Sequence, residues 1–367
     1  MNSPLPKESA RSYRKALIAA AGGERDLAAT AQILSRWLTS RLGGPARVTA
    51  LRPPDGAGIA NETLLVDATV ERSGRREGEQ LVIRVKPSAV RIFPDPDFSG
   101  LFRLLDVLRS ADLVRVPEVL WLEEDDSVLG SPFLVMRRLD GRVPVSEPPY
   151  AGVGWIADAT AAERRAMWTS AVEELARIHL VPGEAVSLIG WPQYGATGED
   201  QQLGYWDHYR KWSGVPVGED MAELYDWILA RRPNEAGTSL SWGDARIGNM
   251  IFGADFRLRG VLDWDQMSLA SPRHDLAWWL LLDELNTTWK GLSRPEGYGS
   301  REDTIALWEA RTGRRVGDLT WHEAFAAYKL ALVASHTLRC AGAPEDAEAS
   351  ASFISGLGRA AAGLTIR

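Results

Sequence analysis

Two aspartates and an asparagine in the second half of the chain have a spacing suited to phosphate chemistry. Asp244 and Asn249 are five residues apart in the segment Ser241-Trp-Gly-Asp-Ala-Arg-Ile-Gly-Asn249, and Asp263 follows after apolar text. Transfer of a phosphoryl group needs a carboxylate that orients the acceptor hydroxyl and takes its proton. It also needs oxygen ligands for Mg²⁺, which binds one or two carboxylates together with phosphates and water. These three residues can supply both parts.

The spacing predicts a separate role for each residue. Asp244 is the expected base, and Asn249 and Asp263 are the expected magnesium ligands. Arg246, two residues after the base, can stabilise the charge on a transferring phosphoryl group. The alternative is that Asp and Asn only form a turn, as they often do. Apolar segments on both sides of Asp263 and Asn249 favour the functional interpretation.

The elements that must position these residues change character near residue 140. Alternating apolar residues predict strands, and helical spacing predicts two helices, within the first 139 residues. The predicted strands are Arg47–Leu51, Glu62–Val70, Leu81–Lys86, Pro117–Leu122 and Phe133–Arg137, and the predicted helices are Asp26–Leu42 and Phe98–Arg109. The charged run Glu71–Gln80 is expected to be a solvated loop between two strands.

Helical patterns dominate after Gly141. Thr160 and Glu163 form a predicted capping box that starts a helix ending near His179. Other helices are predicted at Leu203–Trp212, Met221–Arg231, Asp275–Asn286, Arg301–Thr312 and Trp321–Ala341, with a β pair at Met250–Phe252 and Leu258–Leu262. The expected fold class is α+β with two lobes: an antiparallel-sheet lobe at 1–139, including the N-terminal helix, and a mostly helical lobe at 140–367.

Composition narrows the classes of function. The net charge of −7 argues against a nucleic-acid-binding protein, which would carry a basic stripe. A single cysteine, Cys340, excludes a disulfide within the chain and fits a reducing compartment. No apolar run reaches the roughly 20 residues of a membrane-spanning helix, and none resembles a signal peptide. We therefore expect a cytoplasmic protein without a membrane or nucleic-acid partner; the oligomeric state stays open.

Three segments resemble a known family. The loop W-G-D-A-R-I-G-N, the segment L-D-W and the segment S-P-R-H-D-L-A resemble the patterns H-G-D-x-x-x-x-N, I-D-W and D-P-x-x-D-L-A. These patterns are typical of the aminoglycoside-phosphotransferase-like (APH) family of small-molecule kinases, and the resemblance covers about residues 30 to 340. It implies a protein-kinase-like fold and transfer of the γ-phosphoryl group from ATP, with Mg²⁺, to an alcohol.

The resemblance also implies nucleotide contacts in the first lobe. The turn formed by Gly58, Ile59, Ala60 and Asn61 matches a phosphate-covering turn, although Ala60 stands where the family has a hydroxyl residue. Arg84 matches the third-strand lysine that contacts the α- and β-phosphates. Lys86, on the same strand face, is the alternative.

The expected adenine contacts are Met136 and the backbone groups of Arg137 and Leu139. The segment that matches the following helix, Phe98–Leu105, has no carboxylate to pair with the phosphate-binding residue. Trp242 replaces the loop histidine, and Asp275 is expected to brace the loop through its backbone N–H groups.

The loop looks most similar to kinase domains fused to acyl-CoA dehydrogenases. That resemblance implies a hydroxyl acceptor that is neutral or anionic, with a hydroxyacyl-CoA thioester as the first candidate. Tyr205, Tyr209 and Trp212 share one helical face, which either packs in the core or lines the cleft. The alternatives for the function are an aminoglycoside or macrolide kinase, a protein kinase and a nucleotide-binding pseudokinase regulator. GTP is the alternative to ATP as the phosphoryl donor.

Overall fold

The structure is a computed structural model in which the chain forms two compact units. It describes residues 12–13, 15–17, 25–54, 61–87, 89–94, 96–146, 148–187, 189–234 and 238–364. The β-rich unit contains the described residues up to 106 together with 117–139, and the helical unit contains 107–116 and those from 140 onward.

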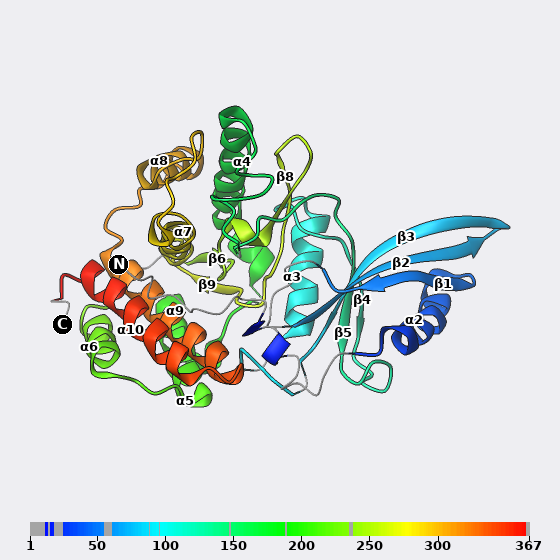
Figure 1. Ribbon diagram of the computed structural model, residues 1–367, viewed down its shortest axis with the longest axis horizontal. Helices are drawn as coiled ribbons and strands as arrows, with labels where there is room; N and C mark the ends of the chain where they lie inside the picture. The colour runs from blue at the N-terminus through cyan, green and yellow to red at the C-terminus, as the bar shows by residue number, and fades with distance from the viewer. Residues whose placement is uncertain are drawn as a thin grey trace. The chain divides into compact units, whose positions relative to one another are not determined.

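The β-rich unit is a five-stranded antiparallel sheet with one helix packed on it (Figure 1). The strand order is β1 (Ala46–Arg52), β2 (Glu62–Arg72), β3 (Arg75–Val85), β5 (Phe133–Arg137) and β4 (Val119–Glu123). Helix α2 (Leu27–Leu42) starts at the cap residue Asp26, whose carboxylate accepts two backbone N–H bonds. Its apolar side packs on the buried face of β2 and β3, because alternate strand residues point to that face.

The hairpin between β2 and β3 differs from the predicted loop. Strand pairing continues to Arg72 and Arg75, and only Ser73 and Gly74 turn, both with positive φ (49° and 73°). Arg72 of β2 contacts Glu77 and Glu79 of β3 at 2.6 and 3.2 Å, and Arg76 contacts Glu71 at 3.4 Å. The prediction of a loop over Glu71–Gln80 was wrong, because cross-strand ion pairs stabilise strand pairing in a segment rich in charged residues.

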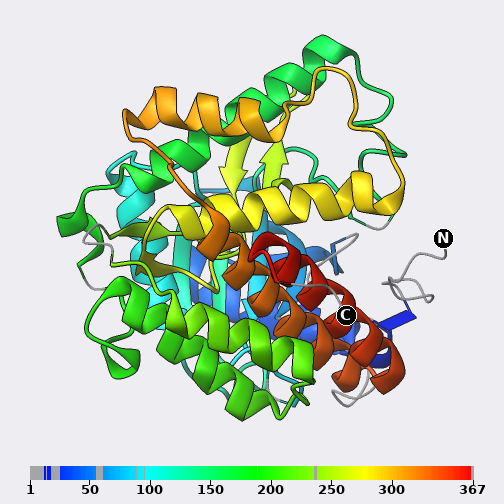
Figure 2. The same ribbon diagram turned by 90° about the vertical axis from the view of Figure 1, so that its left-hand side faces the viewer.

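The helical unit contains most of the predicted helices. Helix α3 (Phe98–Ser110) begins in the β-rich unit and ends here. The others are α4 (Ala161–His179), α5 (Gly198–Ser213), α6 (Glu219–Ala230), α7 (Arg273–Asn286), α8 (Arg301–Thr312), α9 (Thr320–Cys340) and α10 (Pro344–Ala361). The capping box at Thr160 and Glu163 is present, as predicted. Helix α10, which was not predicted, lies along α9 (Figure 2).

Two short antiparallel pairs hold the loops that carry the predicted chemistry. Strand β6 (Ser239–Ser241) pairs with β9 (Ser268–Ala270), and β7 (Met250–Phe252) pairs with β8 (Leu258–Val261). The second pair was predicted and the first was not. Because the loops 242–249 and 262–267 each leave one of these pairs and enter the other, they lie next to each other. Among the described residues, no helix combines the length and apolarity needed to cross a membrane.

Candidate active site

The carboxylate of Asp244 is held by three hydrogen-bond donors within the helical unit. The indole Nε1 of Trp278 donates to Oδ1 at 2.8 Å. Asn249 Nδ2 and Arg246 Nε donate to Oδ2 at 2.6 and 3.1 Å. The side chain keeps a quarter of its surface exposed. The carboxylate is thus fixed in orientation while one side stays open to a reacting group.

Asn249 is turned so that its amide nitrogen serves the loop. Besides the carboxylate, Nδ2 reaches the backbone oxygen of Asp244 at 3.1 Å, and the side chain is buried. An amide has one donor end and one acceptor end. With the donor end used inside the loop, Oδ1 is the atom that Asn249 can offer to a cation.

Asp263 has a backbone conformation that few non-glycine residues adopt. Its φ is 58°, in the left-handed region. Such strain persists only where neighbours fix it. Here the indole Nε1 of Trp242 donates to the carbonyl oxygens of Leu262 and Asp263 at 2.9 and 3.1 Å. Trp242, in place of the family's histidine, therefore uses its one donor to hold the loop that presents Asp263.

Asp275, at the start of α7, braces the loop as predicted. Its two oxygens accept the N–H groups of Trp242 and Gly243 at 2.7 and 2.9 Å, and also the Ser241 hydroxyl at 2.9 Å. Gly243 has φ 89°, and a Cβ there would lie 2.1 Å from the carbonyl oxygen of Gln266, so no other residue fits.

His179 completes this buried arrangement. Trp308 Nε1, which can only donate, bonds to Nδ1 at 2.9 Å, so the proton of the imidazole is on Nε2 and is donated to Asp275 at 3.0 Å. Burial raises the pKa of Asp275, but hydrogen bonds from His179 and from the loop backbone outweigh burial and lower it below its ordinary value. His179 is thus a structural residue, and Asp275 stays ionised.

Arg246 connects the base to a narrow pocket lined by Tyr150, Asp283, Asn286 and Tyr298. Burial acts to lower the pKa of Arg246, and the carboxylates of Asp244 and Asp263 raise it above its ordinary value. The Asp283 carboxylate in the pocket accepts the Tyr150 hydroxyl at 3.2 Å.

Arg294 is the counter-ion of Asp283 and binds it directly. Burial raises the pKa of Asp283, which Arg294 partly offsets. The pocket is therefore lined by the Arg246 guanidinium and by the Asp283 carboxylate, whose charge is offset by Arg294.

The predicted nucleotide residues lie in the β-rich unit. Arg84 is half-buried in β3 opposite Thr63 and Leu134, whereas Lys86 follows the end of the strand. Asn61 is buried, and Gly58, Ile59 and Ala60 lie outside the described residues. Helix α3 carries one carboxylate, Asp106, just after the segment Phe98–Leu105.

The predicted adenine-binding residues begin in β5. Met136 is buried in the sheet, and the Arg137 N–H donates to the Glu118 carbonyl at 2.9 Å. Leu139 follows the end of the strand.

The aromatic face of α5 packs in the core. Tyr205 and Tyr209 are buried, and Tyr205 stacks on Trp191 with ring centroids 4.3 Å apart. Of the two interpretations left open, core packing is the one that the burial supports. The face gives no information about an acceptor.

Trp278 was not among the predicted site residues, because a tryptophan by itself does not indicate contact with a catalytic carboxylate. Asp275 and Trp278 are, however, three residues apart on α7 and so share one face. Because Asp275 was expected to contact the loop, this spacing indicates that Trp278 faces the same loop.

Residues 54–319 match the sequence profile of the phosphotransferase enzyme family. The chain belongs to that family. The matched part includes both loops with Asp244, Asn249 and Asp263. Membership confirms the predicted phosphotransferase class of enzyme.

Curated relatives of this family member carry acyl-CoA dehydrogenase names. Acyl-CoA dehydrogenase family member 10 of Mus musculus is 31% identical over 207 residues, which are 56% of this chain and 18% of that protein. Probable acyl-CoA dehydrogenase IBR3 of Arabidopsis thaliana is 29% identical over 237 residues, 61% of this chain and 27% of that protein. The chain thus spans about a fifth to a quarter of their length. The predicted resemblance to this branch is confirmed.

Solved structures of other phosphotransferases share the fold. A putative aminoglycoside phosphotransferase from Ralstonia eutropha superposes with a TM-score of 0.58 at 23% identity, over 88% of this chain and 97% of that one. A thermostable mutant of aminoglycoside phosphotransferase APH(4)-Ia, in complex with ADP and hygromycin B, gives 0.58 at 17% identity, over 90% and 98%. The predicted protein-kinase-like α+β fold is confirmed.

Proposed function

We propose that this phosphotransferase is a small-molecule kinase that moves the γ-phosphoryl group of ATP to a hydroxyl, with Asp244 as the base. The observation that carries the proposal is the Asp244 carboxylate, fixed by Trp278, Asn249 and Arg246 and still partly exposed. A base that orients a hydroxyl must be pre-organised and accessible, and Asp244 is both.

Transfer of the γ-phosphoryl group forms one P–O bond and breaks another. The acceptor oxygen bonds to the γ-phosphorus, the bond to the bridging oxygen breaks, and ADP leaves with that electron pair. The hydroxyl proton passes to the Asp244 carboxylate late in the step. Arg246, whose guanidinium lies between the base and the pocket, is the group that would stabilise charge on the phosphoryl oxygens.

Asn249 Oδ1 and the Asp263 carboxylate fit the oxygen donor set that Mg²⁺ prefers. The orientation of the Asn249 amide and the constrained backbone at Asp263 support this assignment. Magnesium, when bound, would neutralise phosphate charge. In the β-rich unit we assign phosphate contacts to Arg84 and to the turn containing Asn61, and the adenine contacts to the backbone at Arg137 and Leu139, beside Met136.

For the acceptor we propose a hydroxyacyl-CoA thioester. The carboxylate of the pocket beside Arg246 is already paired with Arg294, so the pocket has little to attract a polycation such as an aminoglycoside. The acyl-CoA dehydrogenase names of the relatives point to thioester chemistry. An antibiotic kinase is the competing assignment, because hygromycin B is the ligand named for a protein of the same fold.

The test measures ADP release with hydroxyacyl-CoA thioesters, aminoglycosides, macrolides and a generic protein substrate. We expect turnover only with the thioesters. Turnover of aminoglycosides alone would reject the acceptor but keep the kinase, and no turnover with any alcohol would reject the kinase. Asp263→Ala should abolish Mg²⁺-dependent ATP binding in calorimetry, whereas Asp265→Ala in the same loop should not.

A further inference from the structure

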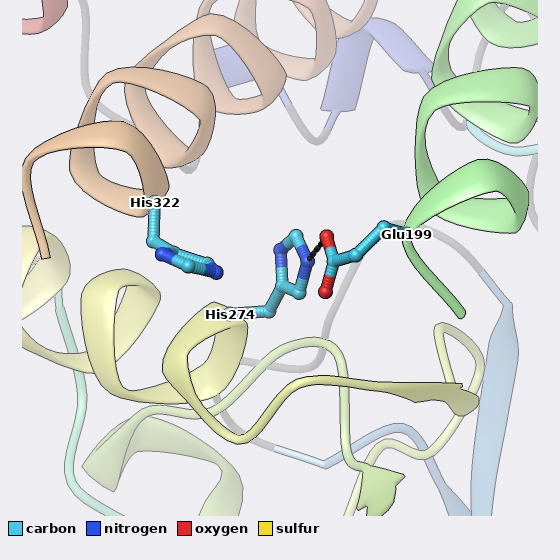
Figure 3. A group of neighbouring side chains, drawn as sticks. All are labelled: Glu199, His274 and His322. Atoms are coloured by element: carbon cyan, nitrogen blue, oxygen red, sulfur yellow. Dashed lines mark hydrogen bonds and ion pairs between the residues drawn. The ribbon is translucent and has the colours of Figure 1, made fainter. Parts of the chain in front are cut away.

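A second group of chemically active side chains lies in the helical unit, where three helices begin. Glu199 is in the first turn of α5, His274 in the first turn of α7 and His322 in the first turn of α9 (Figure 3). All three are at least 95% buried. One carboxylate oxygen and one nitrogen from each imidazole lie within 4.8 Å of one another. Three segments that are distant in sequence therefore bring metal-ligating atoms together in a dry interior.

The bonds within this Glu199–His274–His322 cluster leave ligand capacity unused. His274 Nε2 lies 2.8 Å from Glu199 Oε2, and the other carboxylate oxygen accepts the Ser271 N–H at 3.4 Å. The Nδ1 atom of His274 is buried and has no hydrogen-bond partner among the described residues. A buried polar atom without a partner is costly and calls for an explanation.

The residue types in the cluster suit a metal ion. Carboxylates and neutral imidazoles are common ligands of transition metals in proteins.

We propose that Glu199, His274 and His322 form a zinc site that ties together the first turns of α5, α7 and α9. Two imidazole nitrogens and one carboxylate oxygen are a ligand set that Zn²⁺ takes, with water in the fourth position. Nitrogen ligands do not suit Mg²⁺, so this site is chemically distinct from the one at Asn249 and Asp263. Tetrahedral zinc with bonds of about 2.0–2.2 Å holds its ligand atoms about 3.4 Å apart. The His274 Nε2 and Glu199 Oε2 atoms, now 2.8 Å apart, would separate slightly, and atoms now up to 4.8 Å apart would approach each other.

The surroundings make Glu199 the deciding ligand. Arg273 and Lys329 both act to lower the pKa of His322, so the local potential opposes a cation. The Glu199 carboxylate is the charge in the cluster that offsets them. Replacing this carboxylate by an amide of the same shape should therefore weaken zinc binding more than 100-fold, because the neutral amide leaves the dication facing positive neighbours.

The experiment uses the full chain stripped with a chelator and titrated with Zn²⁺ by calorimetry. We expect one zinc per chain, a higher Tm with zinc, and loss of both effects in Glu199→Gln and His322→Gln. His336→Gln is the matched control and should keep zinc binding: it is also on α9, but its half-buried imidazole lies 3.6 Å from Cys340, outside the cluster. Zinc that is lost in His336→Gln and kept in His322→Gln would overturn the proposal.

A measurement on the unmodified chain avoids dependence on how well the variants fold. Co²⁺ bound by two imidazoles, a carboxylate and water in tetrahedral geometry should give strong visible absorption that excess Zn²⁺ removes. Weak absorption typical of six-coordinate cobalt, or no binding at excess metal, would show that the cluster is only a hydrogen-bonded network.

Discussion

At the scale of single residues, the site depends on how Asp244 is held. Three donors on one carboxylate would make it a poor base if they came from charged, buried groups only. Two of them, Trp278 and Asn249, are neutral, and the side chain remains a quarter exposed. The three hydrogen bonds therefore fix the orientation of the Asp244 carboxylate, which can still accept the proton of the acceptor hydroxyl.

Asp244→Asn tests the base directly. Asparagine preserves the shape but cannot accept the hydroxyl proton as a carboxylate does. We expect kcat to fall by about 10²–10⁴-fold, because that is the usual contribution of a general base. ATP affinity measured by calorimetry should change little, since the base does not contact the donor phosphates. Undiminished kcat would remove Asp244 from the mechanism.

Trp278→Phe tests the positioning of the base. The variant keeps an aromatic ring but loses the indole N–H that binds Asp244 Oδ1. A hydrogen bond to a charged group contributes about 1.5–3 kcal/mol, so kcat should fall roughly 10- to 100-fold while the KM for ATP stays constant. Trp289→Phe, at an exposed tryptophan, is the control. A change in both parameters, or in neither, would contradict a positioning role.

At the scale of elements, α7 organises the catalytic loop from its first turn. Asp275 receives the loop backbone and Trp278 reaches the base, so one helix end fixes two parts of the site. In the β-rich unit, β3 sets which basic side chains share a face. The predictions for Asp275 and for Arg84 therefore depend on the position of α7 and on the register of β3.

Asp275→Asn should loosen the loop. Each carboxylate oxygen accepts one backbone N–H of the loop, from Trp242 or from Gly243, so in either orientation the new NH₂ group faces a donor in a buried site. We expect the free energy of unfolding to fall by about 3 kcal/mol in urea, together with at least a tenfold loss of kcat. Asp255→Asn, an exposed position in the β7–β8 hairpin, should change neither. Equal stability of the two variants would contradict the bracing role.

Arg84→Ala and Lys86→Ala compare two positions on one strand face. Arg84 lies within the paired part of β3, whereas Lys86 follows its end, and Arg84 is the position that matches the lysine of the family. The KM for ATP should rise far more in Arg84→Ala than in Lys86→Ala. Equal or reversed effects on KM would show that the other residue, or neither, contacts the phosphates.

At the scale of the whole molecule, α10 helps to close the core of the helical unit. It packs on α9 and α6, and its Arg359 is 1% exposed while contacting Asp220 and Glu223 of α6. Those carboxylates are partly exposed, so they can be rehydrated when the arginine is removed. Much of the energetic role of Arg359 is therefore the packing of its long side chain.

Arg359→Ala should destabilise the helical unit without affecting chemistry. Loss of a buried arginine leaves a cavity and removes its ion pairs with Asp220 and Glu223, and we expect the free energy of unfolding to drop by about 2–4 kcal/mol. The KM for ATP at permissive temperature should be unchanged. Arg339→Ala, an exposed residue on α9, provides the comparison. Equal unfolding midpoints in urea would contradict the proposed role of α10.

The grouping of the predicted site residues in the helical unit depends on short distances along the sequence. Asp244, Arg246 and Asn249 are in one loop, and apolar strands on both sides bring Asp263 to it, so short-range spacing was enough to group them. The same holds for the helix cap at Thr160, where the partner is three residues away. Periodicity also located β2 and the second half of β3, because their buried residues alternate.

Only the tertiary structure decided what depends on distant partners. The charged hairpin stays a strand because Arg72 finds Glu77 and Glu79 across the ribbon, and charge alone does not reveal that pairing. Trp278 matters because α7 docks beside the loop. The Glu199–His274–His322 cluster draws on three helices more than 40 residues apart in sequence. Such contacts arise from packing between elements, which local pattern does not encode.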